Sequence, residues 1–539
     1  MNEQTPIPAA ETSAAENILS SAPDGVIQPT AVPQSFPLKK QWDLNLRDRI
    51  FAWIMLPFGF LFARYVLLRA DGFVTTAFFW LLFACTEIYL RKSGCKPKLP
   101  HRILGIIFCL FSTVFSITAS PLLHGLCFIF LAAVLIWRTH AAAAGAGFVT
   151  RFMPFDLAES AFREPARHFG AAPQAMSYSI KKSPAASTVR TIVIGLLVTI
   201  PLTAVVAVLL SSADAGMESW LLRATDLITD NVMTTILELA LGIPAAFWLF
   251  GLAYGALQRR KRPNPMPAES FYEELLDRLR RIPNAGLYAG VTPICLLYLM
   301  YVVSQTGYFL SAFAGKLPGD MIYSEYARRG FFELCVIAVI NLVVILVLTG
   351  FAKKSGSTRP KLLTGYAAVL CLFTLFIIAT ALAKMALYIK AYGLTALRLY
   401  TAWFMVLLAV VFLVLLVRQF AKKLPTSAIL TVSFTVLFGL LCFSRPEALI
   451  AEYNITRYEA GTLKELDAAM LCTLSEDAYT VMARHPEALQ RAGQWESFRK
   501  NAEARTDTYR THNDRSWNLP AQILIQRVHT DDAFREQTK

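Results

Sequence analysis

The chain has 539 residues, of which 55% are hydrophobic and 17% are charged, and its mean hydropathy is +0.46. Because soluble globular proteins carry about a quarter charged residues, this composition argues against a water-soluble fold. The formal net charge is +14, but residues 444–539 carry 13 basic and 15 acidic side chains, so the positive excess lies in the loops between the preceding apolar segments. Such a distribution is typical of membrane topology signals and argues against nucleic-acid binding.

Eleven apolar segments predict transmembrane helices. A bilayer core about 30 Å thick requires roughly 20 apolar residues of helix, and only a helix or a closed barrel pairs its own backbone polar groups there. The expected spans are residues 50–68, 73–90, 103–119, 121–137, 191–211, 232–257, 285–304, 330–350, 362–383, 399–418 and 426–443. The sequence therefore predicts an all-α polytopic helical membrane protein with about 11 transmembrane helices (10–12) and a small helical C-terminal tail domain.

Charge and composition divide the chain into five parts. The first residues are polar and rich in Ala, Ser, Thr and Pro, without the basic start and apolar stretch of a signal peptide, and they predict a disordered leader. The expected parts are a cytoplasmic leader (1–40), about four spans (41–137), a basic cytoplasmic linker (138–190), a core of about seven spans (191–443) and a helical extramembrane tail (444–539).

Basic residues alternate between the two sides of the predicted spans. The N-terminal flank and every second loop after it carry 30 lysines and arginines, whereas the other loops carry 8. The positive-inside rule therefore predicts that the N-terminus lies in the cytoplasm. An odd number of spans places the tail on the far, periplasmic or extracellular side. Only Ser120 separates the third and fourth spans; if these two form one broken unit, the tail lies in the cytoplasm instead.

The sequence contains no clear motif for catalysis, metal binding or cofactor binding. Most of the nine cysteines lie in apolar segments without CxxC or Cys/His spacing, and none of the seven histidines is spaced with a second ligand. There is no P-loop, GxSxG, HExxH or Rossmann fingerprint. We expect no catalytic residue, no metal and no cofactor, and the sequence leans against an enzyme without settling the question.

Four polar residues fall within predicted spans or at their mouths. Glu238 lies about six residues below the outer end of its span, where a carboxylate requires protein, water or a cation such as Arg329 or Lys384. Arg329 and Glu333 are four residues apart on one helical face, and Asn341 lies near the bilayer midplane. These residues form either structural pairs that fix helix packing or a polar pathway through the helices.

A positive rim is predicted on the far side of the membrane. Lys384, Lys390 and Arg398 lie in or beside a loop without acidic residues, against the usual charge bias, and Arg328 adds to them. Such a rim suits anionic lipid headgroups, or it pairs with acidic residues of the tail. The sequence leaves both alternatives open.

Five segments carry distinctive sequence patterns. They are LLSSADAGM (209–217), SQTGYFLSAF (304–313), YSEYARRGFFELCVIAVINLVVI (323–345), MALYIKAYGLTALRLYTAWFM (385–405) and YNITRYEAGTLKELDAAMLCTLSEDA (453–478). On these segments the chain resembles DUF4173, a bacterial membrane family related to DUF4153. In the tail, the likeness to an Asn-x-x-Arg, Asp and Leu-Ser-x-Asp-Ala pattern rests on Asn454, Arg457, Asp467 and Asp477. The resemblance implies a multi-pass membrane protein and assigns it no activity, substrate or catalytic residue.

Two functional hypotheses follow, with a weaker third. The first is a structural or regulatory protein of the bacterial cell envelope whose tail docks an envelope protein partner; it predicts that Arg329, Glu333 and Asn341 are packed and bonded. The second is a transporter or flippase with a water-filled cavity that reaches Glu238 or Asn341. The third is a membrane transferase acting on a lipid-linked anionic substrate. In each case the lipid bilayer surrounds the protein, and no nucleic-acid partner is expected.

Overall fold

The computed structural model describes residues 42–67, 72–177, 230–261, 269–280, 282–313, 331–353, 361–421, 423–511 and 517–530, with five single positions between 195 and 210. The chain divides into two compact units, residues 1–43 and 44–539, and all helices described below belong to the second. The predicted leader (1–40) lies outside the described residues, as does the predicted span at 191–211 apart from those five positions.

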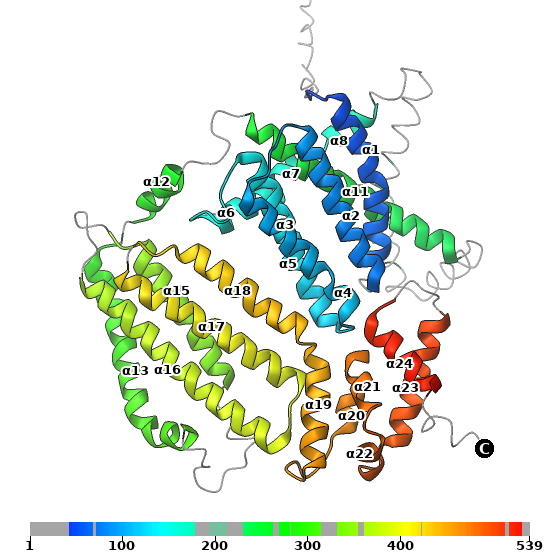
Figure 1. Cartoon of the computed structure of the whole chain (residues 1–539). Helices are drawn as coiled ribbons and strands as arrows, with labels where there is room; N and C mark the ends of the chain where they lie inside the picture. Colours follow the sequence, from blue (N-terminus) through cyan, green and yellow to red (C-terminus); the bar gives the residue numbers. More distant parts are fainter. Residues whose placement is uncertain are drawn as a thin grey trace, which may run out of the picture. The chain divides into compact units, whose positions relative to one another are not determined.

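The first group of helices is built on close contact between α1 (Leu46–Leu61) and α11 (Asp230–Arg260). The other members are η1 (a π-helical continuation of α1, Phe62–Leu67), α2 (Gly72–Lys92), α3 (Leu99–Ser112), α4 (Val114–Ile117) and α5 (Pro121–Ala144) (Figure 1). Pro121 is tolerated at the start of α5 because the first N–H groups of a helix have no helical partner. Gly145 ends α5 in the left-handed conformation (φ 71°) that glycine adopts readily.

Residues 153–177, which we expected as part of a linker, form short helices packed on the first group. They are α6 (Met153–Ala158), η2 (Glu159–Arg163), α7 (Glu164–His168) and α8 (Ala171–Ser177). α7 lies against α11 at two glycines, where a Cβ atom on Gly251 would lie 2.8 Å from the Pro165 carbonyl oxygen and one on Gly255 would lie 2.9 Å from His168 Nδ1. The missing side chains therefore make room for α7.

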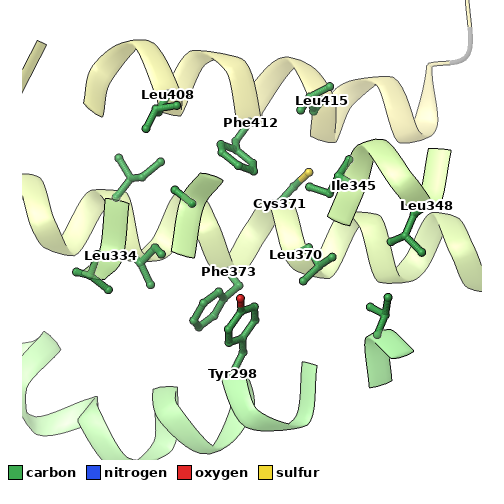
Figure 2. Packing of buried hydrophobic residues seen from close by; sticks show 14 of the residues in the cluster. Tyr298, Leu334, Ile345, Leu348, Leu370, Cys371, Phe373, Leu408, Phe412 and Leu415 are labelled. Atoms are coloured by element: carbon green, nitrogen blue, oxygen red, sulfur yellow. The ribbon is translucent and has the colours of Figure 1, made fainter. Parts of the chain in front are cut away.

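The second group of helices surrounds a continuous apolar core. α12 (Glu269–Leu279) precedes α13 (Asn284–Phe313), α15 (Phe331–Gly350), α16 (Lys361–Tyr392), α17 (Ala396–Phe420) and α18 (Thr426–Phe443) (Figure 1). Phe412 of α17 and Cys371 of α16 are fully buried in this core (Figure 2). The Tyr298 and Phe373 rings stack with their centroids 3.9 Å apart and join α13 to α16. Such ring pairs add a geometric preference to apolar burial and so help to fix helix register.

The tail has an apolar core of its own. Its helices are α19 (Pro446–Glu459), α20 (Ala468–Cys472), α21 (Glu476–Met482), α22 (Pro486–Arg491), α23 (Trp495–Thr511) and α24 (Leu519–Thr530). Ile450, Leu471, Phe498 and Leu524 come from four of these helices and are completely buried together. Burial of this kind supplies the stability that such short helices lack in isolation.

Nine helices in the described residues are long and apolar enough to span a bilayer, and they correspond to nine of the predicted spans. α15 occupies the predicted span at 330–350, and its residues 336–350 form a shorter apolar helix. Residues 99–117 and 121–144 are each long enough to cross a membrane separately. The prediction of an all-α polytopic membrane protein is thus confirmed.

The crossing of α1 and α11 depends on glycine. A Cβ atom on Gly59 would lie 2.1 Å from the Gly242 carbonyl oxygen and 2.7 Å from the Ala246 Cβ atom. We expect Gly59→Ala to destabilise the protein by about 1–3 kcal/mol, because the colliding oxygen belongs to a backbone that cannot rotate away. Gly125→Ala in α5 is the control, since its Cβ atom would meet nothing within 4 Å. Thermal unfolding in detergent compares the two variants, and equal midpoints would contradict the prediction.

Candidate functional site

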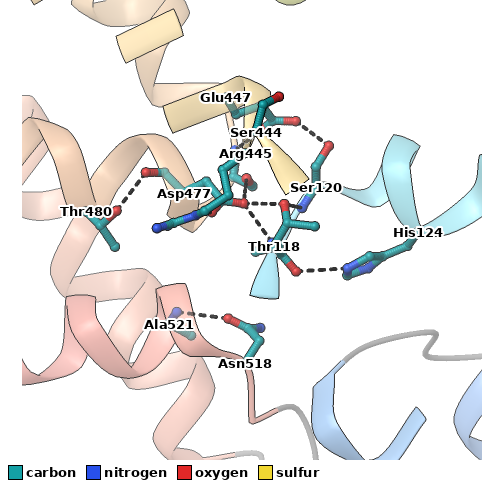
Figure 3. A network of polar contacts seen from close by, with 12 residues as sticks. Thr118, Ser120, His124, Ser444, Arg445, Glu447, Asp477, Thr480, Asn518 and Ala521 are labelled. Atoms are coloured by element: carbon teal, nitrogen blue, oxygen red, sulfur yellow. Dashed lines mark hydrogen bonds and ion pairs between the residues drawn. The ribbon is translucent and has the colours of Figure 1, made fainter. Parts of the chain in front are cut away.

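A buried polar network joins the tail to the turn between α4 and α5 (Figure 3). Asp477, at the start of α21, is completely buried and accepts hydrogen bonds from the Thr118 hydroxyl (2.5 Å) and the Ala119 backbone N–H (2.8 Å). Arg445 pairs with the same carboxylate through Nε, 2.7 Å from Oδ1. These donors, together with the Ser475 hydroxyl at 3.5 Å, compensate the charge of a carboxylate that water does not reach.

A second buried carboxylate lies in the same network. Glu447, in the first turn of α19, accepts hydrogen bonds from the Ser120 hydroxyl (2.5 Å) and the Ser475 backbone N–H (2.6 Å). Both acids stand at helix N-termini, whose partial positive charge stabilises them. Arg445 precedes α19 in a left-handed conformation (φ 51°) that is uncommon outside glycine, and its pairing with Asp477 offsets the strain.

A second contact joins the tail to the turn between α16 and α17. Asn454 of α19 is buried; its Nδ2 donates to the Leu394 carbonyl and its Oδ1 accepts the Leu394 N–H, both at 2.7 Å. Gly393 adopts a left-handed conformation here (φ 78°), and a Cβ atom on it would lie 2.6 Å from Asn454 Oδ1. The amide thus binds the turn as a neighbouring backbone would, at a point where only glycine leaves room.

The remaining residues of the tail pattern have separate tasks. Arg457 donates from Nη1 to the Lys390 carbonyl (2.8 Å) and from Nη2 to the Thr462 carbonyl (3.0 Å), so it also connects α19 to the end of α16. Asp467 is exposed and accepts the Met470 N–H at 2.9 Å, which caps the start of α20. Arg457 therefore joins tail to membrane helices, whereas Asp467 stabilises the tail alone.

Arg398, one of the predicted rim residues, is bonded to its own turn. Its Nη1 donates to the Gly393 carbonyl (2.5 Å) and the Tyr392 carbonyl (3.1 Å), and its Cζ lies 3.9 Å from the centroid of the Tyr388 ring. These contacts satisfy the last carbonyls of α16 and add a cation–π interaction. The Arg398 guanidinium therefore stabilises the same turn, residues 392–395, that Asn454 binds.

The other predicted rim and pathway residues are described to different extents. Lys384 is half-buried in α16 and the Lys390 side chain is exposed at its end. Arg328 and Arg329 lie outside the described residues, and of Glu333 the structure describes the backbone of α15 only. The predicted Arg329–Glu333 pair therefore stays a prediction.

Glu238 is buried in α11 and pairs with Arg64. The distance from Arg64 Nη1 to Glu238 Oε2 is 3.4 Å. We expected Arg329 or Lys384 as the counter-charge, and the partner described instead comes from η1. The close crossing of α1 and α11 explains this pairing, because it brings η1 beside the first half of α11.

Asn341 is completely buried in α15 and is bonded on both sides. Its Oδ1 accepts the Tyr298 hydroxyl (2.6 Å) and its Nδ2 donates to Thr374 Oγ1 (2.8 Å). One amide thus connects α15 with α13 and α16. A polar side chain that bonds across helices in this way helps to fix their packing.

Two ion pairs of buried arginines, at the opposite helix ends from the tail, were not predicted. Arg138 of α5 pairs with Glu87 of α2, and Arg259 of α11 pairs with Glu159 of η2 at 3.3 Å. Glu87 was the available signal, because an acid inside a predicted span requires a partner. The arginines lay at predicted span ends, where a basic residue is read as a topology signal.

A polar contact also joins α12 to α6, the first of the short helices. Asp156 of α6 accepts hydrogen bonds from the Tyr272 hydroxyl (3.0 Å) and the Thr150 hydroxyl (2.9 Å). Burial raises the pKa of the Asp156 carboxyl, and the two hydrogen bonds act in the opposite direction. In the described part of the chain, no three His, Cys, Asp or Glu side chains are grouped to hold a metal ion.

The sequence model of the family described as "Domain of unknown function (DUF4153)" matches residues 105–485, more than half of the chain. The chain belongs to the DUF4153 family. No curated protein and no solved structure matches it. The DUF4153 match begins in α3 and ends just after α21, so it includes both sides of the Asp477 network and both sides of the Asn454 contact.

Proposed function

We propose that this DUF4153 protein is a structural or regulatory component of the bacterial cell envelope, in which membrane helices hold a small helical tail in a fixed orientation for an envelope protein partner. The main support for the proposal is that three residues of the tail pattern, Asn454, Arg457 and Asp477, bind turns or ends of the membrane helices. A third connection supports it, since the Phe73 N–H donates to the Trp517 carbonyl at 2.7 Å. A preorganised surface of this kind lowers the entropic cost of docking.

The transport alternative receives less support than the structural one. A pathway needs water or substrate at its intramembrane polar groups, whereas Asn341 and Glu238 are bonded to Tyr298, Thr374 and Arg64. The fixed bonding of Asn341 favours helix packing over passage of a solute.

Orientation is part of the proposal. We place the N-terminus in the cytoplasm and the tail on the far side of the bacterial inner membrane. The turn at 118–120, the turn at 389–394 and the start of α2 all contact the tail, and the alternation of basic loops assigns all three to that same side. The narrower assignment to DUF4173 likewise stays a proposal, and its support is the likeness at residues 323–345 and 453–478.

Complementation of a deletion strain tests the proposal. We expect Asn454→Ala to abolish growth under envelope stress and to expose the tail to added protease, while Gln490→Ala, which removes an exposed amide from the same tail, does neither. We expect Glu238→Gln to complement at normal abundance. Loss of complementation by a folded, abundant Glu238→Gln protein, with Asn454→Ala still active, would favour a proton-coupled or ion-coupled pathway instead.

A further inference from the structure

A basic cavity lies at the helix ends opposite the tail. Its volume is about 260 Å³, and its walls come from the beginning of α1, the end of α2 and the end of α11. Three cations line it: Arg47, Arg260 and Lys261. A cavity of this size with converging cations suits a single phosphate-bearing group.

The acid in this cavity is already bonded within the protein. Asp48 is buried, and its two oxygens accept the Tyr89 hydroxyl (2.7 Å) and the Asn45 backbone N–H (2.9 Å). Neutral side chains make up the rest of the wall, namely Asn45, Ser93, Tyr254, Leu257 and Gln258. The lining residues therefore include three cations and one carboxylate, so the cavity carries a net positive charge, and an anion is the complementary ligand.

An apolar groove of about 160 Å³ continues from the cavity along α1 and α2. Arg47 lines both spaces, and the groove then follows Ile50 and Ile54 of α1 and Ile88 of α2. These isoleucines are 38–53% exposed, as expected of side chains that face acyl chains. The stacked rings of Phe51 and Tyr89 are also part of its wall.

We propose that this DUF4153 protein binds one anionic phospholipid here, with the phosphate headgroup in the basic cavity and an acyl chain in the groove. A free phosphate would leave the groove empty, and a neutral lipid would bring no negative charge to complement the three cations that line the cavity. The site differs from the predicted far-side rim because it lies at the other ends of the helices: the start of α2 contacts the tail, whereas its end at Lys92 lines the groove.

Native mass spectrometry of the full chain, taken from phosphatidylcholine nanodiscs containing increasing phosphatidylglycerol, tests the headgroup part. We expect one retained phosphatidylglycerol per wild-type chain. R260Q/K261Q should weaken its retention by about tenfold or more, since two cations are removed from the headgroup. The matched control is K353Q/K361Q, which removes two exposed cations from helix ends on the same side and should change nothing. Equal retention of phosphatidylcholine, or equal loss in the control, would overturn the proposal.

Filling the groove tests the acyl-chain part independently. Ile88→Trp should weaken phosphatidylglycerol retention severalfold without changing charge, while Leu81→Trp, at another exposed position of α2 outside the groove, should not. Inorganic phosphate at millimolar concentration should fail to displace the lipid. Unchanged retention by a folded Ile88→Trp protein would refute the placement of an acyl chain in the groove, and displacement by phosphate alone would show that the cavity binds a free anion.

Discussion

Asp477→Ala should release the tail from the membrane helices. The substitution removes a completely buried carboxylate and leaves Arg445 without its ion partner in a left-handed backbone conformation. It also leaves the Thr118 hydroxyl and the Ala119 N–H without an acceptor. Breaking one side of a buried ion pair costs about 3–5 kcal/mol, so we expect a loss of that size in the free energy of tail docking.

Hydrogen exchange and limited proteolysis of the purified protein measure this release. The Asp477→Ala variant should show faster exchange at residues 118–121 and 446–459 and faster cleavage within the tail. Asp467→Ala is the control, because it removes an exposed helix cap from the same tail and should cost only about 1 kcal/mol. Similar protection in the two variants would contradict the assignment of Asp477 as one of the residues that attach the tail.

Glu87→Leu should destabilise the first group of helices by about 3–5 kcal/mol, because it leaves the buried Arg138 guanidinium without its carboxylate. Arg138→Met should cost less, since Arg91 Nε still lies 2.5 Å from Glu87 Oε1. The double substitution should recover most of the loss, as well-packed apolar residues often replace a buried pair at little cost.

Chemical unfolding in mixed micelles gives the free energy of unfolding of the two single variants and the double variant. The double-mutant cycle then gives the interaction free energy between Glu87 and Arg138. Wild type and Gly125→Ala serve as references, because the latter changes α5 at a position without neighbours. Additive losses in the double variant would show that Glu87 and Arg138 act independently and would contradict the pairing.

The apolar segments predicted the membrane helices well because span length follows from bilayer thickness and needs no knowledge of tertiary contacts. For Glu238 the sequence predicted an acid that needs a cation nearby, and the cation described beside it is Arg64. Its identity as Arg64 required the close α1–α11 crossing, which depends on Gly59 and Gly242 rather than on charge spacing. A charge pattern within one helix cannot indicate which distant helix lies beside it.

The contacts between the tail and the membrane helices could not be predicted from the sequence, for a related reason. The residues Asn454, Arg457 and Asp477 were identified as a pattern, but their partners are backbone groups and hydroxyls of turns far away in the chain. Backbone acceptors leave no compositional signature, so Leu394 and Lys390 could not be recognised as partners. Glu447 and Ser120 are 327 positions apart in the sequence. Helical and strand periodicities relate only residues that are close in sequence, so they could not indicate this pair.

Thr118 and Asp477 are separated by 359 positions, so one of the earliest turns to leave the ribosome is completed by one of the last helices. Chains are synthesised from the N-terminus. The polar groups of residues 118–120 therefore lack their acceptors, Glu447 and Asp477, until most of the chain has been translated. A chain interrupted before residue 446 would keep those groups exposed. The finished contact therefore forms only in a chain that has been synthesised at least as far as Asp477.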